Sequence, residues 1–193
     1  MKAAVILLAA LVAFPAAAPA QSDTKTPPRP STPSTSPPSA TPMPRTHIAG
    51  EVVIGERAPD FELDASNGKP LKLSTLRGDW VLLAFGPRKE DVAALSPLVK
   101  ECREMGVQVV GVCDEKAYFL EAFHKKEKLP MLLLADPTKE VSAMYGLYDA
   151  ERYTTGRGFV ILDRQGVVRT ALLGQSLPPQ ETLNMVRFTV QGR

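Results

Sequence analysis

The run WVLLAF, residues 80 to 85, constrains the fold of this chain more than any other segment. It is continuously apolar and lies between two turn-forming pairs, Gly78-Asp79 and Gly86-Pro87. A strand whose two faces are both covered by other elements has such a run, whereas a strand with one solvent-exposed face alternates apolar and polar residues. We therefore expect residues 80 to 85 to form a central, buried strand of a sheet.

A helix is predicted after this strand, because apolar residues recur at helical spacing up to Met105. Acidic Glu90 and Asp91 suit its start and Gly106 suits its end. Pro97 lies inside the pattern, so either the helix is kinked there or its ordered part begins at Ser96 with the proline in the first turn.

The same order, a strand followed by a helix, occurs once more in the rest of the chain, and two such units in succession predict a parallel βαβ crossover. Further along, two apolar runs joined by Arg164-Gln165-Gly166 predict a β-hairpin. The fold class is therefore α/β, with a central mixed sheet in the order βαβα then ββα and helices on both faces. The expected segments are a strand at 107–112, a helix at 116–129, a strand at 131–137, a short helix at 139–147, the hairpin at 158–174 and a closing helix at 178–190.

The first 20 residues have the pattern of a secretory signal peptide. Lys2 precedes an apolar run from Ala3 to Phe14, Pro15 breaks it, and the small residues Ala18-Pro19-Ala20 suit cleavage after position 20. The alternative is a retained membrane anchor, but the unbroken run is too short to span a bilayer. We expect an exported protein, periplasmic or extracellular, with no membrane attachment in the mature form.

Residues 21–46 form a Pro/Ser/Thr-rich segment with Met43 as its one apolar side chain larger than alanine. Such a composition buries too little apolar surface to offset the entropy of ordering, so a disordered linker is expected. A glycosylated stalk or a docking tract are the alternatives. The folded domain is then residues 47–193, which is long enough to form one core.

Charge excludes two classes of partner. The formal net charge is +2, but Lys2, Lys25, Arg29 and Arg45 against Asp23 place +3 in the first 46 residues, which leaves the folded domain near −1. A nucleic-acid or anionic-membrane surface needs a basic patch. We therefore expect no nucleic-acid partner.

Five phrases occur in the order in which a known family has them. They are GERAPDFEL (55–63), GKPLKLSTLRGDWVLLAF (68–85), GVQVVGV (106–112), LPMLLLADPTKEVSAMYGL (129–147) and RGFVILDRQGVVR (157–169). Together they resemble the thioredoxin-fold redoxins, and most closely the peroxiredoxins of the alkyl hydroperoxide reductase and thiol-specific antioxidant family. The resemblance implies a thioredoxin-like fold and an antioxidant oxidoreductase that uses peroxide and an external thiol reductant, without a cofactor.

The family's reactive position is changed in this chain. In that family a proline is followed four residues later by threonine or serine, and three residues after that by the peroxide-attacking cysteine. Counted from Pro87, the hydroxyl position is Asp91 and the cysteine position is Ala94. The resemblance therefore implies a site that has lost its thiol.

A second register comes from the exported thioredoxin-like disulfide reductases. Counted from Phe85 or Pro97, it would place their two cysteines within residues 89–93, which contain none. Both registers agree that no thiol lies between Gly86 and Glu101.

Arg157 lies six residues before Asp163, and this resembles the family position whose arginine helps to hold the peroxide. The alternative is a solvated loop arginine between two glycines. Asp91 would place a carboxylate where the family has a hydroxyl, and a negative charge beside a thiolate raises the pKa of that thiol. The change suits a site with no thiol to activate.

The two cysteines of the chain, Cys102 and Cys113, are not expected to form a disulfide. Helix and strand geometry places them more than ~10 Å apart, beyond bridging distance. Cys102 fits the apolar helix face and is interpreted as a core thiol. Cys113 ends a parallel strand, at the edge where such sheets bind ligands, so it is either a relocated nucleophile or a structural thiol; Asp114 and Glu115 beside it disfavour a thiolate.

Two hypotheses for function follow. The first is an exported redoxin by descent that is either inactive or dependent on Cys113. The second is a non-catalytic binding module in which the emptied site, with Asp91, Arg157 and Lys89, holds a peptide or a small polar ligand. No cluster in the sequence has the spacing of metal ligands, so we expect no metal.

Overall fold

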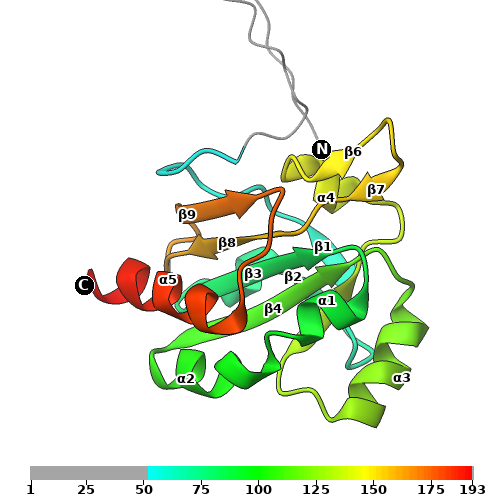
Figure 1. Ribbon diagram of the computed structural model, residues 1–193, viewed down its shortest axis with the longest axis horizontal. Helices are drawn as coiled ribbons and strands as arrows, with labels where there is room; N and C mark the ends of the chain where they lie inside the picture. Colours follow the sequence, from blue (N-terminus) through cyan, green and yellow to red (C-terminus); the bar gives the residue numbers. More distant parts are fainter. Residues whose placement is uncertain (1–51, 193) are drawn as a thin grey trace, which may run out of the picture. The chain divides into compact units, whose positions relative to one another are not determined.

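The computed structural model describes residues 52–192. The predicted signal peptide, the predicted linker and the predicted start of the domain at residue 47 lie outside this range. Figure 1 shows a twisted sheet with helices packed against it. The strands are β1 (Glu62–Asp64), β2 (Pro70–Lys72), β3 (Trp80–Gly86), β4 (Val107–Cys113), β5 (Leu132–Ala135), β6 (Tyr148–Asp149), β7 (Thr154–Thr155), β8 (Gly158–Leu162) and β9 (Val168–Leu173). The helices are α1 (Lys89–Ala93), α2 (Val99–Glu104), α3 (Ala117–Glu127), α4 (Glu140–Met144) and α5 (Pro179–Gln191), with short 3-10 helices η1 (Leu73–Leu76) and η2 (Ser96–Leu98).

The central sheet has five strands in the order β5-β4-β3-β8-β9. β3, β4 and β5 are parallel, while β8 is antiparallel to β3 and to β9. This is the mixed βαβα then ββα sheet that the sequence predicts, with the predicted buried run as its middle strand β3. Within residues 52–192, no helix combines the length and the apolar character that a bilayer crossing requires.

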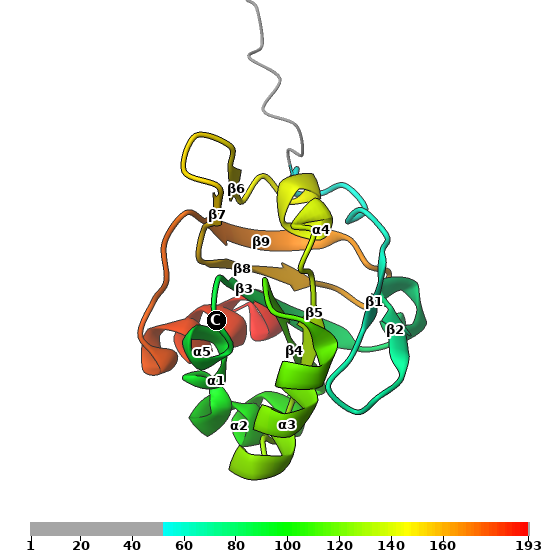
Figure 2. The same ribbon diagram turned by 90° about the vertical axis from the view of Figure 1, so that its right-hand side faces the viewer.

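Helices cover both faces of the sheet, as predicted. Figure 2 shows α1, α2, α3 and α5 on one face and α4 on the other. Alternate residues of β3 serve the two cores: Leu82 packs toward the first group of helices, while Leu83 packs on the α4 side. The fully buried Tyr145 anchors the α4 side, because its ring lies against Phe85 and its hydroxyl donates to the carbonyl of Pro59 at 2.9 Å.

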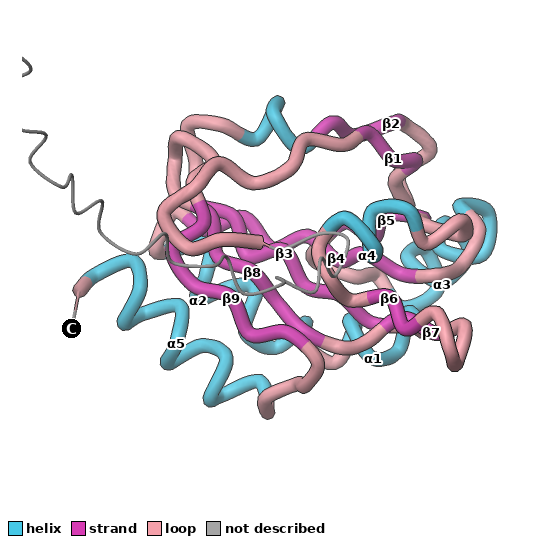
Figure 3. Tube along the Cα trace, turned by 90° about the horizontal axis from the view of Figure 1, so that it is seen from above, coloured by secondary structure: helices cyan, strands magenta, loops and turns pink. Residues whose placement is uncertain are grey.

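The sequence missed two short antiparallel pairs. β1 pairs with β2, and β6 pairs with β7. Figure 3 shows the β1–β2 hairpin at the rim beside β5, where a bridge between Ala65 and Leu134 joins it to the edge of the central sheet. Strands of two or three residues are too short to give an alternating pattern, which explains why no signal predicted them.

The segment between β3 and β4 is broken rather than one continuous helix. α1 ends at Ala93, and a separate turn, η2, begins at Ser96 with Pro97 in its first positions and continues into α2. Of the two alternatives for Pro97, the structure has the one with the ordered part starting at Ser96, because a proline is compatible with a first turn and not with a helix interior. The separate helix α1 was not predicted.

α1 is held on the sheet by close packing against a glycine. Val92, which is fully buried in α1, lies over Gly111 in β4. A Cβ atom at Gly111 would lie 2.2 Å from Val92 Cγ1 and 2.9 Å from a methyl group of Leu133. The absence of a side chain at position 111 therefore sets how near α1 approaches the sheet.

We predict that Gly111→Ala lowers the free energy of unfolding by about 1–3 kcal/mol, because the added methyl overpacks this contact. Urea denaturation measures the change. The double variant Gly111→Ala/Val92→Ala is the control: it removes the clashing methyls, so it should be less destabilised than the sum of the two single variants. Additive losses, or a Gly111→Ala protein as stable as the parent, would show that α1 does not pack as described.

Candidate functional site

The candidate site is a cavity of about 380 Å³ beside the carboxyl end of β3. Its wall combines α1 and the residues after it, the start of β8, and the segment that leads into α5. The lining residues are Ala84, Phe85, Glu90, Asp91, Val92, Ala94, Leu95, Arg157, Gly158, Phe159, Ser176, Leu177, Pro179 and Thr182. This cavity brings together three of the residues that the sequence singles out, namely Asp91, Ala94 and Arg157.

An ion pair between Asp91 and Arg157 joins two sides of the cavity. A guanidinium Nη2 of Arg157 donates to Asp91 Oδ1 at 2.9 Å, and Arg88 contacts the same oxygen at 3.5 Å. The side chain of Asp91 is 13% exposed, whereas that of Arg157 is 45% exposed. Arg157 is therefore an exposed loop arginine that is also paired with Asp91.

The electrostatics of Asp91 follow from these contacts. Burial alone would raise the pKa of its carboxyl, but the hydrogen bonds and charges of Arg157 and Arg88 outweigh burial and hold the pKa below its ordinary value. Asp91 is thus a carboxylate at neutral pH. Its second oxygen, Oδ2, is buried and has no hydrogen-bond partner among the described residues.

Ala94 lines this cavity at the carboxyl end of α1, where its N–H bonds to the carbonyl of Glu90 at 3.1 Å. Residue 94 therefore lies at the negative, carboxyl end of this short helix, where the helix dipole does not stabilise a thiolate. Pro87 lies between β3 and α1 and does not line the cavity.

Lys89, which the binding hypothesis placed in the site, lies elsewhere. Its ammonium group contacts Glu115 at 2.8 Å and Glu90 at 3.2 Å, and its backbone N–H also donates to Glu115 at 3.1 Å. The pKa of Lys89 is raised, chiefly by its hydrogen bond to Glu115. This lysine ties α1 to the segment after β4 and is not a cavity residue.

Cys113 ends β4 and is 1% exposed. In the sheet register it is the partner of Gly86, so it lies beside the chain that leads into α1, but it does not line the cavity. Burial raises the pKa of its thiol strongly, and the nearby carboxylates of Glu115, Asp114 and Asp91 raise it further. These surroundings favour the structural interpretation of this thiol over the nucleophilic one.

Cys102 is fully buried in the core between α2 and the sheet. Burial raises the pKa of its thiol to about 11. Both cysteines are free thiols, as the sequence geometry predicts. Within residues 52–192, no group of three histidine, cysteine or acidic side chains is placed to hold a metal ion.

Sequence analysis missed the part of the wall that comes from the end of the chain. Phe159 reaches the cavity from β8, Ser176 and Leu177 from the loop before α5, and Thr182 from the start of α5. No local pattern distinguishes them, because their role depends on the long-range packing of α5 against η2, on the face of the sheet shown in Figure 2.

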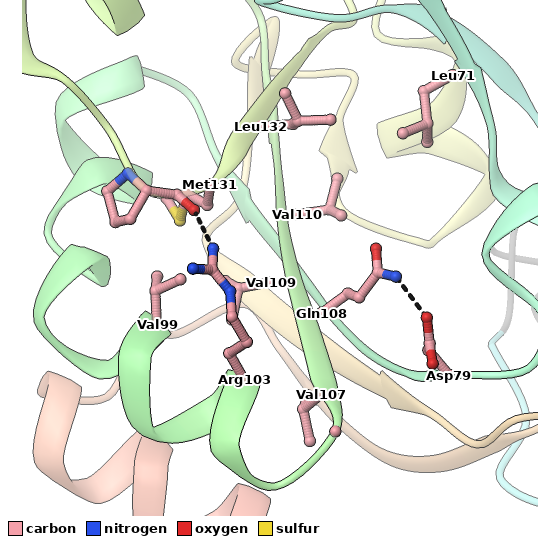
Figure 4. A pocket seen from close by; sticks show the side chains of 12 residues that line it. Leu71, Asp79, Val99, Arg103, Val107, Gln108, Val109, Val110, Met131 and Leu132 are labelled. Atoms are coloured by element: carbon pink, nitrogen blue, oxygen red, sulfur yellow. Dashed lines mark hydrogen bonds between the residues drawn. The ribbon is translucent and has the colours of Figure 1, made fainter.

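A second cavity, of about 440 Å³, lies near the opposite, amino end of β4. Figure 4 shows two polar contacts in its wall: Arg103 donates to the carbonyl of Pro130 at 3.0 Å, and Gln108 donates to Asp79. None of the residues predicted for the site lines it. It is therefore separate from the site that contains Asp91 and Arg157.

Comparison with known proteins agrees with the motifs. A model of the AhpC/TSA family matches residues 54–171. Peroxiredoxin Q of Sedum lineare chloroplasts is 30% identical over 156 residues, which cover 76% of this chain and 84% of that protein. A peroxiredoxin of Thermoplasma volcanium is 32% identical over 130 residues, which cover 61% of this chain and 64% of that protein.

Solved structures of low identity show the same fold. A mutant of Xylella fastidiosa PrxQ has a TM-score of 0.64 at 16% identity, over 72% of this chain and 97% of that one. Enterococcus faecalis AhpC has a TM-score of 0.64 at 18% identity, over 71% of this chain and 91% of that one. The thioredoxin-like fold and the family resemblance are both confirmed, and the chain belongs to the AhpC/TSA family.

Proposed function

We propose that this chain is an exported redoxin whose family site has lost thiol chemistry and serves as a non-catalytic binding site. The observation that carries the proposal is the cavity itself, which holds a charged pair, Asp91 and Arg157, and has no sulfur in its lining. A cavity with apolar walls and a few convergent polar groups is the usual form of a small-molecule site.

The state of the two cysteines supports the same proposal. A peroxide is attacked by a thiolate, so a peroxidatic cysteine needs a lowered pKa and access to the peroxide. Cys102 and Cys113 are buried and their thiol pKa values are raised, and neither lines the cavity. Asp91 strengthens the argument, because it neutralises Arg157, the cation that would otherwise stabilise a thiolate there.

The second candidate function is a peroxidase that depends on Cys113, with peroxide as substrate and an external thiol as reductant. One observation favours it: Cys113 lies in register with Gly86, at the base of the segment that carries Asp91. Such an enzyme would have to expose this thiol before it reacts, because the described structure buries it.

Export through residues 1–20, and a spacer role for residues 21–46, are part of the proposal. They rest on the apolar run and the cleavage pattern of the first segment and on the composition of the second. The binding domain would then work outside the cytoplasm, at a distance from whatever its amino-terminal segment contacts.

We predict that hydrogen peroxide, with a sulfenic-acid trap, modifies neither cysteine faster than it modifies a free thiol at the same pH. Mass spectrometry at Cys102 and Cys113 measures the rates. The protein unfolded in urea is the control: both thiols should react several-fold faster there, because unfolding removes the burial that raises their pKa. Rapid, selective trapping at Cys113 that disappears in Arg157→Gln would instead establish a relocated nucleophile.

The vacated position gives a further prediction. The single variant Ala94→Cys should carry a thiol with little acidity, because Asp91 neutralises Arg157 and residue 94 caps the carboxyl end of α1. Adding Asp91→Thr removes the carboxylate and releases Arg157, so the thiol pKa should fall by roughly one unit or more. Iodoacetamide rates across pH measure both values. Equal thiol pKa values in the single and double variants would show that position 94 is not beside the ion pair.

A further inference from the structure

Helix α3 has one side that the rest of the described domain leaves open to solvent. Figures 1 and 2 show α3 at the rim of the molecule, and Leu120 is the residue of this helix that is fully buried. On the opposite side, five residues at helical spacing are all exposed, and we call them the outer face of α3. They are Tyr118, Phe119, Ala122, Lys125 and Lys126.

Two aromatic rings distinguish this face from an ordinary solvated helix surface. Tyr118 is 59% exposed and Phe119 is 49% exposed, and their ring centroids lie 4.0 Å apart. Apolar area that remains in water contributes nothing to the hydrophobic stabilisation of the fold. Burial of the two rings against another surface would gain this stabilisation, and tyrosine and phenylalanine are enriched at protein interfaces for this reason.

The outer face of α3 is arranged symmetrically about Ala122. The two aromatic residues lie four and three positions before it, and the two lysines lie three and four positions after it. If two copies of the helix pack antiparallel about a two-fold axis through position 122, Tyr118 faces Lys126 of the second copy. Phe119 then faces Lys125 of the second copy. An ammonium group is attracted to the face of an aromatic ring, so this surface is complementary to itself, as a two-fold dimer requires.

Charge and size also allow two copies of this face to approach each other. The ammonium group of Lys125 lies 3.6 Å from Glu121, and that of Lys126 lies 3.5 Å from Glu127. The lysines therefore bring no unbalanced charge that would repel the second copy. Ala122 is small, which permits close helix axes, and antiparallel packing places opposite ends of the two helix dipoles together.

We propose that the chain forms a homodimer through the outer face of α3, with Ala122 on the two-fold axis. The inference does not rest on the binding function proposed above, because none of the five residues lines the cavity that contains Asp91. One face of a helix of 11 residues is smaller than a standard interface of about 1,600 Å². We therefore expect a weak, reversible dimer with a dissociation constant on the order of 10 μM.

A disulfide between the two copies of position 122 tests the axis. Helix axes about 8–10 Å apart, less two Cα radii of about 2.3 Å, leave about 3.4–5.4 Å between the facing Cα atoms, which overlaps the disulfide range of about 4.4–6.8 Å. The full chain with Ala122→Cys, oxidised with diamide, should form a covalent dimer at least tenfold faster than the full chain with Asn184→Cys. Asn184 is the matched control, because it is an exposed residue of α5. The native Cys102 and Cys113 are buried, so non-reducing gel electrophoresis reports the introduced thiols, and equal rates would overturn the proposal.

Analytical ultracentrifugation of the full chain tests the contacts without a cross-link. Phe119→Lys places a lysine opposite Lys125 of the second copy, so the dissociation constant should rise at least tenfold. Phe188→Lys is the matched control, because Phe188 is 63% exposed on α5 and outside the outer face of α3. Its dissociation constant should equal that of the parent chain.

The pairing of Tyr118 with Lys126 can be tested separately. The losses of affinity in Tyr118→Ala and Lys126→Ala should not add in the double variant, because each substitution removes the same contact. Additive losses, a parent chain that stays monomeric well above the expected dissociation constant, or a dimer that Phe119→Lys leaves intact would overturn the proposal. These results are independent of the loss of thiol chemistry, which is decided by trapping at Cys113.

Discussion

The ion pair between Asp91 and Arg157 connects the two parts of the chain on which the site depends. Asp91 comes from α1, which follows the middle strand β3, and Arg157 directly precedes β8, the antiparallel neighbour of that strand. The pairing of β3 with β8 and the packing of Val92 on Gly111 bring the two residues together. The pair then neutralises the guanidinium of Arg157, and the proposed loss of thiol chemistry rests on that neutralisation.

Much of the fold was predictable because long elements leave a strong pattern. The buried run of β3, the parallel β4 and the hairpin of β8 and β9 were all evident in apolar runs and turn residues. The break between α1 and η2 was only partly predicted: Pro97 indicated either a kink or a start at Ser96, and the five residues of α1 are too few to show periodicity. The short pairs β1–β2 and β6–β7 have the same limitation.

The site was predictable in part for a different reason. The motif order of the family placed Asp91, Ala94 and Arg157 near one another, although Asp91 and Arg157 lie 66 residues apart in sequence. The ion pair of Lys89 with Glu115 depends on how distant segments pack, and so does the part of the cavity wall that Leu177 and Thr182 form. No local sequence pattern encodes this packing. The sequence placed Cys113 correctly at the end of a strand; its burial comes from the elements that pack around it.

The pKa of Asp91 tests the central claim most directly, and ¹³C NMR titration of its carboxyl carbon measures it. The account predicts a midpoint below the ordinary value of about 3.9, and a higher midpoint in Arg157→Gln. Because the pKa of Asp91 is lower in the folded than in the unfolded protein, the pair stabilises the fold at any pH above the pKa of the unfolded state. This contribution is lost as the pH falls through the pKa of the folded state. An ordinary midpoint that Arg157→Gln does not change would contradict the account.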